Sequence, residues 1–197
     1  MADDEILDAT WRALCTTGYA DLTMQDIADE TTKSKAALHY HYDSKRDLLE
    51  RFFDHLADRF LDRVTDAAAA ADGSGAARLS AVVDAALSPP DTGDIEDVQT
   101  ALLELKAQSP HEQSFREGLC AFDEQFRTLV ADIIADGIDD GSIQADVDPE
   151  ETAHLIVTML AGAQLRQVSV GENRQTVHDH IERHLEQRVY RREVLSE

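Results

Sequence analysis

The chain is poor in lysine, aromatic residues and cysteine. Its 197 residues include four lysines and two cysteines, and aromatic residues make up only 6%. No run of about 18 apolar residues occurs, which excludes a transmembrane helix, and the acidic start Met-Ala-Asp-Asp-Glu does not resemble a secretory signal peptide. Cys15 and Cys120 lie far apart in apolar helical patterns, which indicates reduced structural thiols rather than a disulfide. We therefore expect an intracellular, cytoplasmic protein with no membrane partner.

The sequence also lacks the common motifs of nucleotide-binding and nucleophilic enzymes. No phosphate loop, dinucleotide-binding fingerprint or nucleophile motif occurs. His180 and His184 are four residues apart, a spacing that can bind a metal ion, but no third ligand lies nearby in the sequence. A solvated helix face is the preferred interpretation. We predict no enzymatic activity, metal or cofactor, and keep a metal-dependent enzyme at these histidines as an alternative.

Negative charge dominates the composition. The 40 Asp and Glu residues against 18 Lys and Arg give a net charge of −22. Self-repulsion at this charge destabilises a compact state unless salt screens it. The preference for Asp over Glu and for Arg over Lys resembles proteins of extreme halophiles, whose cytoplasm is rich in potassium chloride. We therefore expect a halophilic protein, with an ordinary acidic bacterial protein as the alternative.

The few lysines are concentrated in one short segment, which is locally basic. Three of the four lysines fall within residues 22–49, and from Lys33 to Arg46 four basic residues stand against one acid, Asp43. A phosphate backbone is the partner that such a positive region on an acidic protein indicates.

Capping signals divide this segment into two short helices and the start of a long one. Thr23 can cap the first helix, with Asp26 in its first turn, and Ser34 can cap the second. Leu38 and Tyr42 are four residues apart and face inward, so the opposite face of that helix points to solvent. Two short helices joined by a turn, with small or basic residues outward, have the geometry that fits a DNA major groove.

The long helix has its own cap, Ser44, with Asp47 three residues later as the reciprocal partner.

These residues resemble the N-terminal signature of the TetR family of transcriptional regulators. The match runs over about residues 5–56. It rests on Gly18-Tyr19, Leu22-Thr23-Met24, Ile27-Ala28, Ser34-Lys35, Leu38, Tyr40-His41-Tyr42, Ser44-Lys45 and Leu48-Leu49.

The chain departs from the family pattern at the turn before the second short helix. The family's common Ala-Gly is Thr31-Thr32 here, Lys33 stands where an apolar residue is usual, and His39 stands where Tyr is frequent. A left-handed conformation would cost Thr32 about 1–2 kcal/mol. We therefore expect this turn to differ in detail from that of the family.

The resemblance implies an all-α protein with a three-helix DNA-binding domain over residues 1–47 and a larger regulatory, dimerising domain over residues 48–197. Two copies of the helix over residues 33–42 are expected to enter successive major grooves of a palindromic operator. Base contacts are expected from Lys35, Ala36, Ala37 and His39, and phosphate contacts from Thr23, Tyr40, His41 and Lys45. The predicted DNA-binding residues are Thr23, Lys33, Ser34, Lys35, Ala36, Ala37, His39, Tyr40, His41 and Lys45.

Apolar periodicity predicts helices throughout the remainder. Their expected spans are 3–17, 45–71, 76–87, 95–107 and 149–170, followed by a last helix with Val177, Ile181, Leu185 and Val189 on one face. Ser109-Pro110-His111-Glu112 predicts another helix start, with a capping serine, proline at the first helical position and glutamate three residues after the cap.

The larger domain is expected to hold a ligand pocket and a dimer interface. The resemblance implies the pocket, which Phe53, Phe60, Leu102, Leu105, Phe115, Leu119, Phe122 and Phe126 could line, with plain core packing as the alternative for each. The last two helices are expected to pair with their twofold mates through Leu155, Met159, Gly162, Ala163, Val177, Ile181 and Leu185, unless they only close their own domain. We predict a repressor released from its operator by a small-molecule effector of unknown identity, with an effector-independent DNA-binding protein as the alternative.

Overall fold

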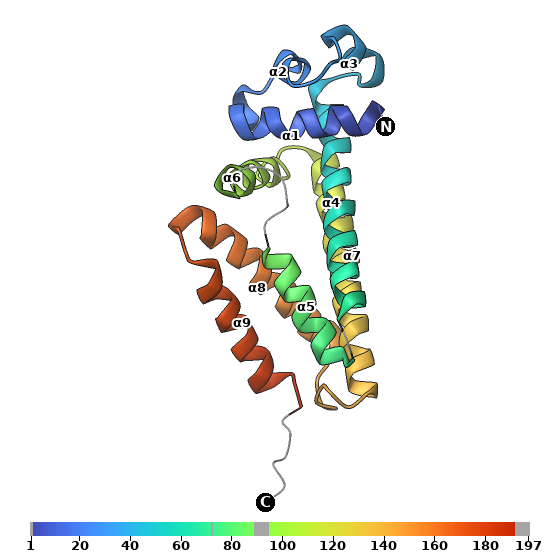
Figure 1. The fold of residues 1–197 in the computed structure, drawn as a ribbon, viewed down its shortest axis with the longest axis vertical. Helices are drawn as coiled ribbons and strands as arrows, with labels where there is room; N and C mark the ends of the chain where they lie inside the picture. The colour runs from blue at the N-terminus through green and yellow to red at the C-terminus, as the bar shows by residue number, and fades with distance from the viewer. Residues whose placement is uncertain (1, 72, 89–94, 192–197) are drawn as a thin grey trace, which may run out of the picture. The chain divides into compact units, whose positions relative to one another are not determined.

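The described residues form helices, turns and one isolated backbone bridge. The structure is a computed structural model and describes residues 2–71, 73–88 and 95–191 (Figure 1). Its helices are α1 (Ala2–Asp21), α2 (Met24–Asp29), α3 (Lys35–His41), α4 (Lys45–Ala70), α5 (Gly75–Leu87), α6 (Ile95–Lys106), α7 (Gln113–Asp139), α8 (Pro149–Val170) and α9 (Arg174–Arg188). The predicted all-α fold is confirmed. Within these ranges, no helix combines the length and the apolar character that crossing a membrane requires.

The chain divides into two compact units, each with its own apolar core. Unit 1 consists of Met1–Arg59 and Pro89–Ala121, and unit 2 consists of Phe60–Ser88 and Phe122–Glu197. The long helices α4 and α7 each begin in unit 1 and end in unit 2. The division predicted at residue 47 separates DNA binding from regulation, not one compact unit from another, and it stays a prediction.

Unit 1 is organised around α1. The ring of Trp11 on α1 packs against Phe52 on α4, with 5.9 Å between the ring centroids. Ile27 of α2 and Leu38 of α3 are fully buried in the same core. Isolated helices as short as α2 and α3 are unstable in water, so both depend on this packing.

The helix predicted over residues 3–17 continues to Asp21, with a kink at Gly18. Gly18 has φ +76°, a left-handed value that favours glycine, and the chain then continues for a few residues to Asp21. Directly after the break, the Tyr19 N–H donates a 2.8 Å hydrogen bond to Glu104 of α6. The kink therefore frees a backbone donor that attaches α6 to α1.

In unit 2, the turn after α7 caps the start of α5. The Asp140 carboxylate accepts a 2.7 Å hydrogen bond from the Gly75 N–H, and the Ser142 hydroxyl accepts one of 3.0 Å from the Ala76 N–H. A Cβ atom added to Gly75 would lie 2.3 Å from the Cα of Gly137. The close approach of α5 and α7 thus requires glycine.

One predicted helix start is wrong. The capping pattern predicts that α7 begins at Pro110, but it begins at Gln113, and residues 107–111 form turns that follow α6. A capping residue needs an extended backbone, whereas Ser109 lies within these turns. The side chain of Arg116 instead donates to the carbonyl oxygens of Ser109 and Pro110, at 3.3 and 3.2 Å.

Candidate functional site

α2 and α3 form the predicted helix-turn-helix pair, and their N-terminal caps are those predicted from the sequence. The Thr23 hydroxyl accepts from the Asp26 N–H at 3.3 Å, and the Asp26 carboxylate accepts from the Thr23 N–H at 2.7 Å. The Ser34 hydroxyl accepts from the Ala37 N–H at 3.2 Å. Capping satisfies backbone donors that have no partner within the helix, so these side chains fix where each short helix begins.

The outward face of α3 is small, polar and exposed. Leu38 and Tyr42 are buried, at 0% and 3% exposed, which confirms the predicted inward face. Tyr40 is 86% exposed, and its ring contacts the neighbouring His41 ring edge to face, with 5.4 Å between the centroids. The exposed residues of α3 are Lys35, Ala36, His39, Tyr40 and His41.

Lys33 lies outside α3, which corrects the expected span of residues 33–42. It occupies the turn before the helix, and its Nζ lies 3.6 Å from the Glu5 carboxylate. Lys35, in the first turn of α3, forms neither an ion pair nor a hydrogen bond with the described residues. Of these two neighbouring lysines, only Lys35 offers a charge that the protein does not itself engage.

Lys45 stabilises the framework of unit 1. Its Nζ donates to the carbonyl oxygens of Leu22 and Tyr19 at 2.8 and 3.3 Å, and lies 5.2 Å from the centroid of the Tyr19 ring. The ammonium group therefore binds backbone that follows the kink in α1. Its role as a phosphate contact stays a prediction. In that role, the Lys45 ammonium group would bind a phosphate as well as the two carbonyl oxygens.

The turn between α2 and α3 contains no left-handed residue. Within the described ranges, positive φ values occur only at glycines, so the strained conformation considered for Thr32 is absent. The Glu5 carboxylate of α1 instead accepts from the Thr32 hydroxyl at 2.7 Å, the Thr31 hydroxyl at 2.8 Å and the Thr32 N–H at 3.2 Å. These hydrogen bonds, helped by Lys33, lower the pKa of Glu5 to about 2.

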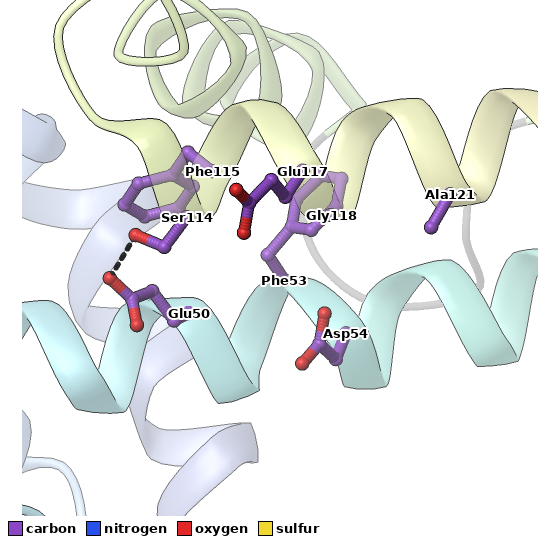
Figure 2. Close-up of a pocket in the computed structure, with 8 residues that line it drawn as sticks. All are labelled: Glu50, Phe53, Asp54, Ser114, Phe115, Glu117, Gly118 and Ala121. Atoms are coloured by element: carbon purple, nitrogen blue, oxygen red, sulfur yellow. Dashed lines mark hydrogen bonds between the residues drawn. The ribbon is translucent and has the colours of Figure 1, made fainter.

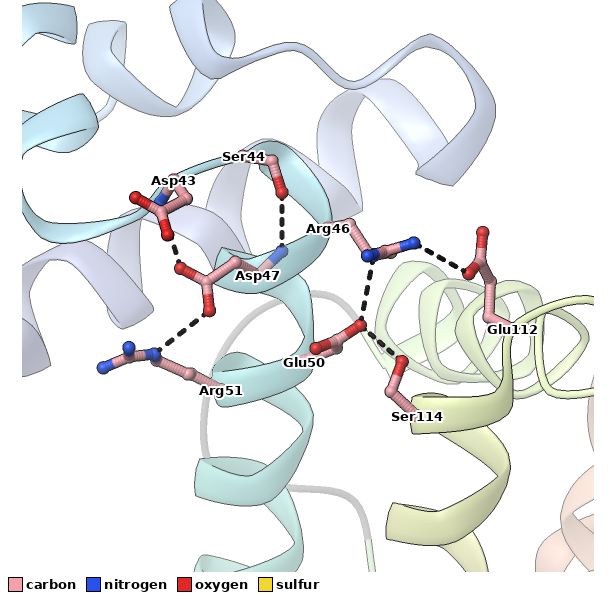
Figure 3. Close-up of polar contacts among 8 residues, drawn as sticks. All are labelled: Asp43, Ser44, Arg46, Asp47, Glu50, Arg51, Glu112 and Ser114. Carbon is pink, nitrogen blue, oxygen red and sulfur yellow. Dashed lines mark hydrogen bonds and ion pairs between the residues drawn. The ribbon is translucent and has the colours of Figure 1, made fainter.

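The junction between the helix-turn-helix and α4 is also capped by side chains (Figure 3). The Asp47 N–H donates to the Ser44 hydroxyl at 3.1 Å, as predicted. The Asp47 carboxylate, however, accepts from the Asp43 N–H at 3.1 Å rather than from that of Ser44. The cap therefore reaches one residue further back than expected, towards the end of α3.

A second network attaches the first turns of α4 to the region where α7 begins (Figure 3). Arg46 forms ion pairs with Glu50 and with Glu112, each at 3.4 Å. Ser114 of α7 donates a short hydrogen bond of 2.5 Å to the same Glu50 carboxylate. Glu50 thus links Arg46, in the first turn of α4, to Ser114 of α7.

Glu50 also lines a cavity between α4 and the start of α7 in unit 1 (Figure 2). The cavity has a volume of about 320 Å³. Its lining residues are Glu50, Phe53, Asp54, Ser114, Phe115, Glu117, Gly118 and Ala121. The rings of Phe53 and Phe115 meet edge to face, with 6.4 Å between their centroids. Burial, together with the neighbouring carboxylates of Asp58 and Glu50, raises the pKa of Asp54.

The predicted ligand-binding residues are divided between the two units. Phe53 and Phe115 line the cavity in unit 1, whereas Leu102, Leu105 and Leu119 pack in or against the core of that unit. The other three, Phe60, Phe122 and Phe126, form an aromatic cluster in unit 2, with centroid distances of 5.3, 5.1 and 6.2 Å.

Sequence reasoning missed the three cavity carboxylates Glu50, Asp54 and Glu117, because acidic residues on helix surfaces are common in this chain. Glu50 and Asp54 are four residues apart on α4, which places them on one face of that helix, but Glu117 lies on α7.

The predicted interface residues fall into two groups. Ala163, Val177, Ile181 and Leu185 are buried in the core of unit 2. Leu155, Met159 and Gly162 lie on a more accessible side of α8, where Leu155 is 44% and Leu165 48% exposed. Apart from its chain neighbours and the nearby backbone of α8, no described atom lies within 4 Å of a Cβ built on Gly162. An apolar stripe on α8 is therefore available for contact with another molecule.

His180 and His184 both lie on α9. Among the described residues, no group of three or more His, Cys, Asp or Glu side chains could hold a metal ion.

Two family models together cover most of the chain. Residues 6–52 match the model described as bacterial regulatory proteins, tetR family. Residues 75–189 match the C-terminal model of the BetI-type transcriptional repressor. No curated protein sequence matches the chain.

Solved structures with the same fold include transcriptional regulators. A TetR transcription regulator from Haloarcula marismortui is 36% identical, with 95% of this chain and 97% of that chain covered and a TM-score of 0.85. A protein from Saccharomonospora viridis assigned as a transcriptional regulator, in complex with choline, is 23% identical, with 97% and 98% covered and a TM-score of 0.84. FadR from Bacillus subtilis in complex with stearoyl-CoA is 17% identical, with 92% and 96% covered and a TM-score of 0.77.

The different surroundings of Lys35 and Lys45 predict different effects of replacing them. Lys35→Ala should leave the melting temperature unchanged and reduce the salt dependence of DNA binding by about one unit of log–log slope for each copy of α3. Lys45→Ala should destabilise unit 1 by about 1–2 kcal/mol, because two backbone carbonyls lose a charged donor. Thermal melts and fluorescence anisotropy on duplexes recovered by in vitro selection measure both effects. Equal behaviour of the two variants would contradict these assignments.

Proposed function

The chain belongs to the TetR family of transcriptional regulators, and from this membership we propose that it is a repressor that a small-molecule effector releases from a palindromic operator. The observation that carries the proposal is the exposed face of α3, with Lys35, Ala36, His39 and Tyr40 uncovered beside a capped turn. A short helix that projects polar and small side chains from a helix-turn-helix fits a major groove.

In this proposal α3 reads base edges and its surroundings contact phosphates. Lys35 and His39 donate hydrogen bonds to base edges, and the methyl group of Ala36 contacts the methyl group of thymine. The Lys35 charge also lies near the phosphates and displaces counterions from them. Tyr40 and His41 contact phosphate oxygens, which fix the register of the helix in the groove. Ser34 and Ala37 keep their capping hydrogen bond and lie close to the DNA backbone.

A dimer is required for two copies of α3 to bind two half-sites about one helical turn apart. We infer that the α8 stripe with Leu155, Met159 and Gly162 supplies the contact. Two of its features support this inference: Leu155 is 44% exposed, and the space beside Gly162 is open. Exposed apolar stripes of this kind mark protein–protein contacts.

Leu155→Glu tests the interface without disturbing the core of unit 2. The charge would be buried and unpaired in a dimer but solvated in a single copy. The dissociation constant of the dimer should therefore rise by at least about tenfold. Ala77→Glu adds the same charge at an exposed position of α5 and should leave assembly unchanged. Sedimentation velocity with operator binding measures both. If the dimer fraction of Leu155→Glu depends on protein concentration as that of the wild type does, the interface lies elsewhere.

The effector in this proposal is a small organic cation bound in the cavity of unit 1. Three carboxylates, of Glu50, Asp54 and Glu117, line it together with two phenyl rings. A cation over an aromatic face is attracted by the ring quadrupole, and carboxylates add direct charge attraction. The volume of about 320 Å³ is at the small end for ligand pockets. The choline complex of the Saccharomonospora viridis protein supports this class of ligand.

Release follows from a competition for Glu50. A bound cation attracts the Glu50 carboxylate, which otherwise pairs with Arg46 in the first turn of α4. Arg46 then loses one of its two anionic partners, and the start of α4 loses part of its attachment to α7. Because α4 follows α3 after three residues, a shift there moves the reading helices of the two copies.

Choline and its neutral isostere 3,3-dimethylbutan-1-ol separate charge recognition from apolar fit. Isothermal titration calorimetry should detect choline, and the isostere should bind at least about tenfold more weakly, since it lacks the attraction to carboxylates and rings. The variants Asp54→Asn and Glu117→Gln should each lower the affinity for choline by a similar factor. Glu124→Gln, two turns along α7 from Glu117 and outside the cavity, is the control.

Choline should release the wild-type protein and Glu124→Gln from the operator at similar concentrations. Asp54→Asn and Glu117→Gln should need higher choline concentrations for release. Binding of choline without any effect on operator affinity would favour the effector-independent alternative. Equal binding of choline and the isostere would contradict a cation site.

A further inference from the structure

We propose that Glu5 of α1 is a positioning residue for DNA recognition, which holds the turn that orients α3. The proposal rests on the DNA-binding role of α3. It concerns a residue outside the helix-turn-helix itself.

The first support is the convergence of donors on one oxygen atom. Glu5 Oε1 accepts hydrogen bonds from both threonine hydroxyls of the turn and from the Thr32 N–H, at 2.8, 2.7 and 3.2 Å. The other oxygen, Oε2, lies 3.6 Å from the Nζ of Lys33. One side chain of α1 thus contacts the three consecutive residues Thr31, Thr32 and Lys33. Bonds to an ionised acceptor are stronger than neutral ones.

The second support is a matching contact from the same side of α1. Arg12 donates to the carbonyl oxygen of Glu30 at 2.7 Å and pairs with the Glu30 carboxylate at 3.2 Å. Glu5 and Arg12 are seven residues apart, which places them on one face of a helix. Arg12 therefore holds the end of α2, and Glu5 holds the residues that lead into α3.

The third support is that α3 has few other means of fixing its orientation. It is seven residues long, and Leu38 is its one buried residue within the described chain. No glycine or left-handed residue shapes the preceding turn. A helix this short takes its direction from the contacts at its ends and on its single buried side. The Thr-Thr sequence supplies the donors, and Glu5 supplies the acceptor that makes them a defined turn.

Glu5 also affects charge at the DNA-facing side. Its carboxylate neutralises Lys33, and its low pKa of about 2 keeps it ionised. A depressed carboxyl pKa gives a stabilising contribution that is complete above the ordinary value of 4.5 and is lost only as the pH falls towards 2. The Glu5 carboxyl group is therefore ionised at physiological pH. Removing it should free Lys33 and remove a negative charge near the phosphates.

Two opposite effects follow from this dual role, and together they distinguish positioning from simple destabilisation. Glu5→Ala should lower the ratio of operator to scrambled-duplex affinity by about tenfold, since α3 loses its fixed direction. The same variant should bind the scrambled duplex as tightly as wild type or more tightly. General unfolding would weaken binding to both duplexes.

The experiment compares four forms of the full chain at one stated salt concentration, by fluorescence anisotropy on both duplexes and by thermal melts. Glu5→Gln keeps an acceptor oxygen without the charge, so it should retain the wild-type ratio within about threefold while binding the scrambled duplex more tightly. Asp8→Ala removes a carboxylate from an exposed position of α1 that pairs with Arg59 and not with the turn. It should leave the ratio unchanged.

Should Glu5→Ala not fold, Thr31→Val with Thr32→Val removes the two hydroxyl donors and should lower the ratio in the same direction. An unchanged ratio in Glu5→Ala, or an equal loss in Asp8→Ala, overturns the proposal. A wild-type chain that does not distinguish operator from scrambled duplex would instead refute the DNA-binding role of α3.

Discussion

The shortage of positive charge around α3 is the constraint on which the rest of this structure depends. The chain carries 40 acidic against 18 basic side chains, and most basic groups near the helix-turn-helix are engaged by the protein. Lys33 pairs with Glu5, Lys45 binds two backbone carbonyls, and Arg46 pairs with Glu50 and Glu112. Lys35 is left uncovered. In the proposed function, DNA recognition would therefore rely on where α3 is held more than on attraction over a distance.

The contacts that neutralise the basic side chains also hold the turn before α3 and the start of α4 in place. Arg12 and Glu5 fix the turn before α3, while Arg46 and Ser114 fix Glu50 at the start of α4. Exposed pairs contribute little stability individually, and salt screens them further. Hydrogen bonds dominate the turn before α3, whereas the Glu50 network combines two ion pairs with the hydrogen bond from Ser114. Hydrogen bonds depend on short-range geometry, so the turn before α3 should keep its shape in concentrated salt, where long-range charge attraction is weak.

Local sequence signals predicted the helices and caps, and failed where distant segments decide the outcome. Thr23, Ser34 and Ser44 cap the predicted helices, because capping depends on residues three positions away. The start of α7 was misplaced, since turns after α6 include Ser109. Glu5 was missed because its partners lie more than twenty positions away. The cavity carboxylates were missed because acidic residues are common on the helix surfaces of this chain, and because only the pairing of α4 with α7 brings Glu50 and Glu117 to one cavity.

The salt dependence of operator affinity tests this account most directly. If Lys35 is the main free cation on each copy of α3, a dimer releases about two counterions, and the log–log slope should be about −2. Specific binding should then persist in molar potassium chloride, where the Debye length is about 3 Å. If all four basic residues from Lys33 to Arg46 contacted phosphates in both copies, the slope would be about −7. Titration from about 0.1 to 3 M salt, with circular dichroism to follow the fold, separates the two. A slope near the steeper value, with binding tightest at low salt, would contradict the account.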